Sequence, residues 1–95
     1  MAIRLITPEE NVDGEQLLLA RMIAAGAEAV HLRKPSHSEE DVLTWIVHWP
    51  IRLRHYLVLH SFPHLVEQFE LGGFHLNKQV PKETQARLIR EKSFP

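Results

Sequence analysis

The chain has 95 residues, of which 44% are hydrophobic and 24% charged, a composition typical of one small globular domain. Its formal net charge of −1 argues against a general binder of nucleic acid or of membrane surfaces, which needs a basic patch. The absence of cysteine excludes a disulfide framework and any thiolate metal site. No apolar stretch approaches the roughly 20 residues that cross a bilayer, and the first residues do not read as a secretion signal, so we expect a cytoplasmic protein.

The first half of the chain reads as strand, helix, strand and helix. Residues 2–6 are a short apolar strand, and Asp13 is the expected N-cap of a first helix that stops at Gly26. Residues 28–33 form the second predicted strand. Ser38 is the expected N-cap of the second helix.

The second half repeats this alternation. Pro50 prevents the second helix from continuing, and residues 56–60 form the third predicted strand. Pro63 suits the first turn of a short third helix. Residues 74–77 are the fourth predicted strand, and Pro81 opens a last helix.

Four strand–helix units predict an α/β fold with a parallel sheet. Four such units are half of an eight-stranded TIM (β/α)8 barrel, and we expect them to form one domain over residues 1–95. A half-barrel leaves unpaired backbone groups on its two edge strands. The chain is therefore expected to be the front half of a longer barrel, to pair with a partner such as a second copy, or to flatten into an open sheet.

Polar residues end the predicted strands in a repeated pattern. Residues 31–34 (His-Leu-Arg-Lys) are echoed by residues 75–78 (His-Leu-Asn-Lys). Because side chains alternate across a strand, every second residue lines one surface, and burying such a polar surface is costly unless something satisfies it. We therefore predict a ligand pocket at the carboxyl ends of the strands. Its predicted binding residues are His31, Arg33, His60, His75 and Asn77.

Each of these residues also has a purely structural interpretation. Arg33 suits a phosphate or carboxylate ligand, but it could equally form an ion pair with Glu9 or Glu10. The histidines could be hydrogen-bonded core residues, and the asparagine a turn residue. His60 and His64 have the spacing of a helical metal pair, but no third ligand is evident, so no metal site is predicted.

Three further residues favour structural roles. Lys34 could steer a phosphate, but a solvated loop lysine is the simpler interpretation. Trp45 and Trp49 lie four residues apart on the second predicted helix, a spacing that places both on one face. We expect them to pack against the sheet and not to bind a partner.

Residues 29–34 (Ala-Val-His-Leu-Arg-Lys) and 71–76 (Leu-Gly-Gly-Phe-His-Leu) resemble the thiamine phosphate synthase/TenI superfamily of (β/α)8 barrels. The resemblance covers the whole chain, which corresponds to the first half of such a barrel. It implies that Arg33 matches a basic residue that holds the pyrophosphate of the pyrimidine substrate. His31 stands where the synthase has glutamine.

The chain departs from the synthase pattern at the magnesium ligands. His60 and Ser61 stand where the family has an Asn-Asp pair, and residues 77–80, which follow His75-Leu76, contain no carboxylate. Mg²⁺ prefers oxygen ligands, so a Mg²⁺ cofactor is expected only if the chain is synthase-like, and its carboxylates are missing. Whether the chain is an enzyme stays open: it resembles a transferase, thiamine phosphate synthase, and also the thiazole tautomerase branch.

Two functional hypotheses follow. The first is a protein of thiamine biosynthesis that binds a phosphorylated thiazole or pyrimidine and is incomplete without a C-terminal half. The second is a non-catalytic half-barrel that binds a phosphorylated metabolite or assembles with a partner. Neither hypothesis involves nucleic acid or a membrane.

Overall fold

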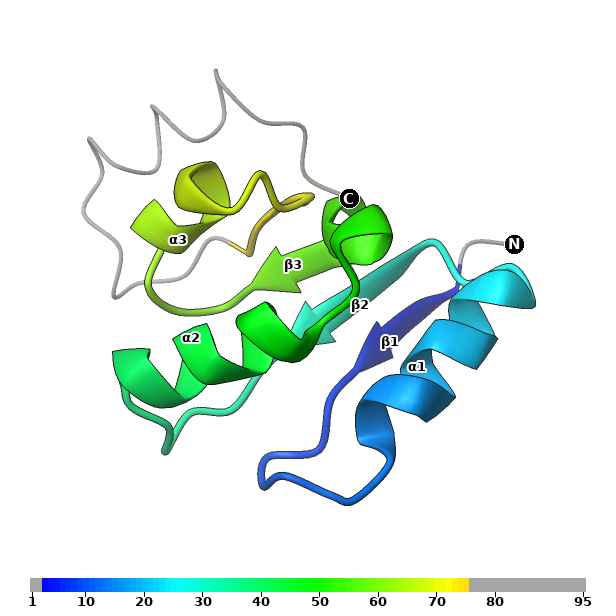
Figure 1. Cartoon of the computed structure of the whole chain (residues 1–95), viewed down its shortest axis with the longest axis horizontal. Coiled ribbons are helices and arrows are strands. Elements are labelled where there is room, and N and C mark those ends of the chain that lie inside the picture. Colours follow the sequence, from blue (N-terminus) through cyan, green and yellow to red (C-terminus); the bar gives the residue numbers. More distant parts are fainter. Residues whose placement is uncertain (1–2, 76–95) are drawn as a thin grey trace.

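A computed structural model describes residues 3–75 of the chain (Figure 1). Four strands form one sheet in the order β1-β2-β3-β4, and every neighbouring pair is parallel. The strands are β1 (Arg4–Ile6), β2 (Ala29–Leu32), β3 (Leu57–Leu59) and β4 (Gly73–Phe74). The predicted α/β architecture of a half-barrel, with parallel strands joined through helices, is confirmed.

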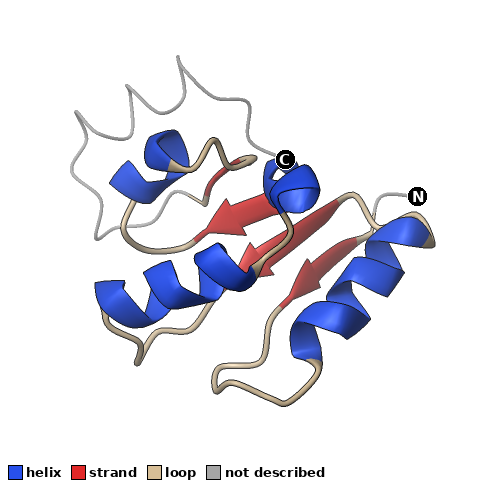
Figure 2. Ribbon diagram, viewed as in Figure 1, coloured by secondary structure: helices blue, strands red, loops and turns tan. Residues whose placement is uncertain are grey.

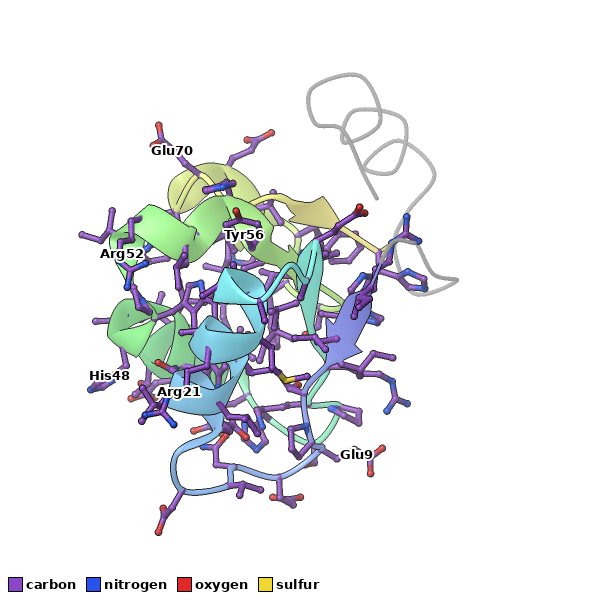
Figure 3. The ribbon with its side chains drawn as sticks, turned by 90° about the vertical axis from the view of Figure 1, so that its right-hand side faces the viewer. Glu9, Arg21, His48, Arg52, Tyr56 and Glu70 are labelled. Atoms are coloured by element: carbon purple, nitrogen blue, oxygen red, sulfur yellow. The ribbon has the colours of Figure 1, made fainter. Side chains whose placement is uncertain are left out.

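The helices lie on one side of this sheet (Figures 2 and 3). They are α1 (Glu15–Ala24), α2 (Glu39–His48) and α3 (His64–Gln68), with a 3₁₀ helix, η1 (Ile51–Tyr56), between α2 and β3. Among the described residues, no helix has the length and apolar character needed to span a membrane.

The hydrophobic core fills the space between the sheet and these helices. Alternate strand residues contribute to it, and Val30, Leu57 and Phe74 are fully buried. From the helix side, Trp45 and Trp49 are both buried in this core, as expected, and their rings stack with centroids 5.2 Å apart. Because one face of each strand is committed to this core, the intervening residues must line the opposite face.

The two longer helices begin differently. Ser38 caps α2 as predicted: its hydroxyl accepts from the Asp41 amide, and the Asp41 carboxylate accepts from the Ser38 amide. The prediction that Asp13 is the N-cap of α1 is wrong. The N-cap is Gly14, whose φ of 79° lies in the left-handed region, and no side chain caps the helix. The Glu15 carboxylate instead accepts from the amide of Val12.

The third strand is shorter than the sequence indicates. Residues 51–56 form η1, so that β3 begins at Leu57 and not at residue 56. The indole of Trp49 donates to the Leu53 carbonyl across 3.0 Å and holds this turn closed. The strand β4 covers Gly73–Phe74, while the rest of the predicted fourth strand after residue 75 and the helix expected from Pro81 lie outside the described residues.

Candidate functional site

Three of the predicted pocket residues meet at the carboxyl ends of adjacent strands. His31 lies near the end of β2, His60 directly follows β3, and His75 directly follows β4. In the sheet register, Leu59 pairs with Phe74, and the amide of His75 donates to the Leu59 carbonyl across 2.7 Å. This pairing sets the residues that follow each strand beside each other, on the face that the helices do not cover.

The three imidazole rings are in contact. Nδ1 of His31 and Nε2 of His60 are 2.9 Å apart and share a hydrogen bond whose direction depends on the tautomers. The rings of His60 and His75 stack, with centroids 4.4 Å apart and an interplanar angle of 14°. His31 and His75 lie edge to face at 6.0 Å. We call these three residues the histidine cluster.

Burial favours the neutral forms of His31 and His60. His31 is only 9% exposed. Desolvation lowers the pKa of His60 to about 4, with further contributions from the charges of His75, His31 and Arg33. Desolvation also lowers the pKa of His31, helped by His75 and Arg4. At neutral pH both rings are therefore uncharged, and each presents one donor and one acceptor nitrogen.

Arg33 lies at the rim of this site. It forms an ion pair with Glu9, as its purely structural interpretation predicted. Its Nη1 is 2.9 Å from Oε1 of Glu9, and the two side chains are 47% and 64% exposed. An ion pair this open to solvent contributes about 0–1 kcal/mol, so a bound anion can exchange for the carboxylate. The charge of Arg33 is close enough to depress the pKa of His60, which links it to the cluster.

Lys34 is not the solvated loop lysine that the sequence favoured. Its Nζ is 3.1 Å from the carboxylate of Glu15, and the lysine side chain is fully buried. Nζ also donates to the carbonyls of Pro8 and Glu10. The same glutamate accepts from the indole of Trp45. Lys34 therefore ties the loop after β1 to the end of β2 and is a structural residue.

Two further sequence expectations bear on the site. His64, considered as a metal partner of His60, instead pairs with Glu39 across 2.9 Å. Asn77 lies outside the described residues. Sequence reasoning missed Glu15 altogether, because a glutamate in the first turn of a helix gives no sign of a buried ion pair.

The cluster does not suit the magnesium ion of the synthase resemblance. Within residues 3–75, the group of three side chains placed to share an ion consists of imidazoles alone: His31, His60 and His75. Mg²⁺ is a hard cation that takes oxygen ligands, and imidazole nitrogen is a poor substitute. No reaction step through magnesium follows from these residues.

Comparison with known proteins rests on one structural match. No protein-family model matches the sequence, and no curated protein matches it either. The crystal structure of thiamine phosphate pyrophosphorylase from Bacteroides thetaiotaomicron is similar, with a TM-score of 0.77 and 26% sequence identity. The chain has a thiamine phosphate synthase/TenI-like fold. The resemblance in its strand-end motifs is thereby confirmed at the level of the fold.

The match covers 86% of this chain but only 42% of the pyrophosphorylase chain. The chain thus spans less than half the length of that protein, in keeping with a half-barrel. In thiamine phosphate synthase/TenI-like folds, as in other (β/α)8 barrels, the carboxyl ends of the strands form the ligand-binding face. The histidine cluster lies at this end of the sheet.

Proposed function

We propose that the chain is a protein of thiamine biosynthesis that binds a phosphorylated thiazole or pyrimidine at the histidine cluster. The convergence of His31, His60 and His75 beside Arg33, at the carboxyl ends of β2, β3 and β4, carries this proposal. The similarity to a thiamine phosphate pyrophosphorylase supports the ligand class. A cytoplasmic location and the involvement of Asn77 in the pocket belong to the same proposal.

The chemistry of each group suits such a ligand. The guanidinium of Arg33 offers paired donors to a phosphate, which would take the place of the Glu9 carboxylate. Neutral His31 and His60 can donate to and accept from the heteroatoms of a thiazole or pyrimidine ring. An imidazole can also carry a proton to or from a bound ring. The missing magnesium carboxylates favour the thiazole tautomerase branch over pyrophosphate chemistry, with further catalytic groups supplied from outside this half-barrel.

Replacing Arg33 with alanine is expected to weaken the binding of thiazole phosphate about tenfold or more, because a charged hydrogen bond contributes roughly 1.5–3 kcal/mol. Isothermal titration calorimetry on the 95-residue chain measures the effect, with the phosphorylated pyrimidine titrated in parallel. The matched control is Glu9→Gln, which removes the competing carboxylate and should leave the affinity equal or higher. Equal affinities of the parent chain and Arg33→Ala would remove Arg33 from the site.

A second candidate function, assembly with a partner, is favoured by the surface beside β1. This strand forms one edge of the sheet, and apolar side chains of β1 and α1 are exposed next to it. They line a hollow of about 320 Å³. Its exposed apolar residues are Ile6, Val12, Leu18 and Met22. In a closed barrel this edge packs against further strand–helix units. For the 95-residue chain alone, we propose that a second copy covers it.

Light scattering is expected to give the mass of a dimer for the parent chain. Leu18→Lys should shift the mass to that of a monomer, because Leu18 is 59% exposed and lines this hollow. Val47→Lys is the matched control: Val47 is similarly exposed, at 56%, but belongs to α2. A parent chain that stays monomeric at high concentration would contradict assembly through this edge.

A further inference from the structure

We propose that His31, His60 and His75 form a binding site for a divalent transition metal ion that favours imidazole ligands, of which Zn²⁺ is the type. This inference goes beyond the proposed function and does not depend on the binding of a phosphorylated ligand. It also differs from the sequence interpretation, which considered His60 with His64 and found no third ligand. The fold places His64 on Glu39 and brings His31 and His75 to His60 in its stead.

The geometry of the cluster is close to that of a three-histidine site. One nitrogen from each ring can be chosen so that all three lie within 4.8 Å of one another. Around a tetrahedral zinc ion with Zn–N bonds of about 2.1 Å, the nitrogens would be separated by about 3.4 Å. His75 is exposed, so its side chain can change rotamer to bring its ligand nitrogen closer to the other two.

The donor set selects the class of ion. Three imidazoles with no carboxylate among them suit Zn²⁺, Cu²⁺ or Ni²⁺ and not Mg²⁺ or Ca²⁺. Each of the three imidazoles can offer one ring nitrogen as a ligand. Three protein ligands leave a fourth position open to water or to an oxygen of a bound molecule, which is the pattern of catalytic and not of structural zinc sites.

An unsatisfied atom in the cluster gives independent support. Nε2 of His31 is buried and has no hydrogen-bond partner among the described residues, while Nδ1 of the same ring is bonded to His60. Leaving a buried polar atom without a partner costs about 1–3 kcal/mol, so such atoms usually have an explanation. Coordination of an ion through Nε2 would satisfy this atom, and Nε2 of His60 would exchange its hydrogen bond with Nδ1 of His31 for coordination of the same ion.

The test uses the metal alone, with no phosphorylated ligand present. The 95-residue chain, freed of metal by a chelator, is titrated with Zn²⁺ by calorimetry and with Co²⁺ by visible absorption. We expect saturation at one ion per chain and the intense visible bands of four-coordinate Co²⁺. His60→Gln should weaken the affinity for Zn²⁺ at least tenfold. Losing a residue that only hydrogen-bonds to a metal ligand already costs about 10–100-fold in metal affinity, and the loss of a ligand itself should cost no less.

His48→Gln is the matched control, because His48 is exposed on α2 and bonds to the Thr44 carbonyl away from the cluster. The affinity of His48→Gln for Zn²⁺ should equal that of the parent chain. If His60→Gln fails to fold by circular dichroism, His75→Gln takes its place, since His75 is exposed and should tolerate the change. Absence of saturable binding, a Co²⁺ spectrum of the hydrated ion, or an equal loss in His48→Gln would each overturn the proposal.

Because no phosphate compound enters this titration, its result is separate from that of the Arg33→Ala experiment. Binding of thiazole phosphate without binding of Zn²⁺ would support the proposed function and contradict the metal site. Binding of Zn²⁺ through the three histidines, without binding of a phosphorylated thiazole or pyrimidine, would support the metal site and contradict the proposed function.

Discussion

Gly72→Ala is expected to lower the free energy of unfolding by about 3 kcal/mol or more, the upper range for overpacking a core. A Cβ at position 72 would lie 2.2 Å from the carbonyl oxygen of His55 and 3.2 Å from that of Leu57. Both contacts are with backbone, which cannot move aside as a flexible side chain can. The amide of Gly72 also donates to the Leu57 carbonyl across 2.9 Å. Alanine would therefore push β4 away from the start of β3.

Urea denaturation measures this loss, and Gly14→Ala provides the matched control. Gly14 has a φ of 79°, but nothing lies within 4 Å of the position of its Cβ. Its replacement should cost only the left-handed backbone term of about 1–2 kcal/mol. Similar losses in the two variants would contradict the steric account. Because β4 precedes His75, Gly72→Ala should also weaken the metal affinity of the histidine cluster.

Lys34→Met is expected to destabilise the fold by about 3–5 kcal/mol, the usual effect of removing one partner from a buried ion pair. Methionine fills much of the volume of the lysine stem, so the change removes the charge and the hydrogen bonds from Nζ to the carbonyls of Pro8 and Glu10. It would leave the Glu15 carboxylate buried, with hydrogen bonds from the Trp45 indole and the Val12 amide but no cation. Thermal unfolding followed by circular dichroism measures the loss.

Two comparisons isolate the ionic contribution. The double variant Lys34→Met with Glu15→Gln should recover much of the lost stability, because a neutral amide can still accept from Trp45 and leaves no unpaired charge. Arg33→Met alters the neighbouring residue, whose ion pair with Glu9 is exposed, and should cost less than about 1 kcal/mol. Equal losses in Lys34→Met and Arg33→Met would show that the burial of the Lys34–Glu15 pair does not matter.

Local patterns in the sequence predicted the architecture and part of the candidate site. Apolar strands alternating with capped helices indicated a parallel sheet, and Ser38 marked the start of α2 correctly. The period of two along a strand set His31 apart from the core residues Val30 and Leu32. These features depend on residues only a few positions apart, so they can be predicted from the sequence.

Other features depend on contacts between distant parts of the chain. The stacking of His60 on His75 follows from the register of β3 against β4, which no short motif specifies. The local pattern gave Lys34 as a loop residue, whereas the fold buries it against Glu15, 19 residues away. The sequence by itself determined which side chains could line a polar face. Only the tertiary structure decided which of them meet, because strand register and helix packing bring together groups that the sequence separates.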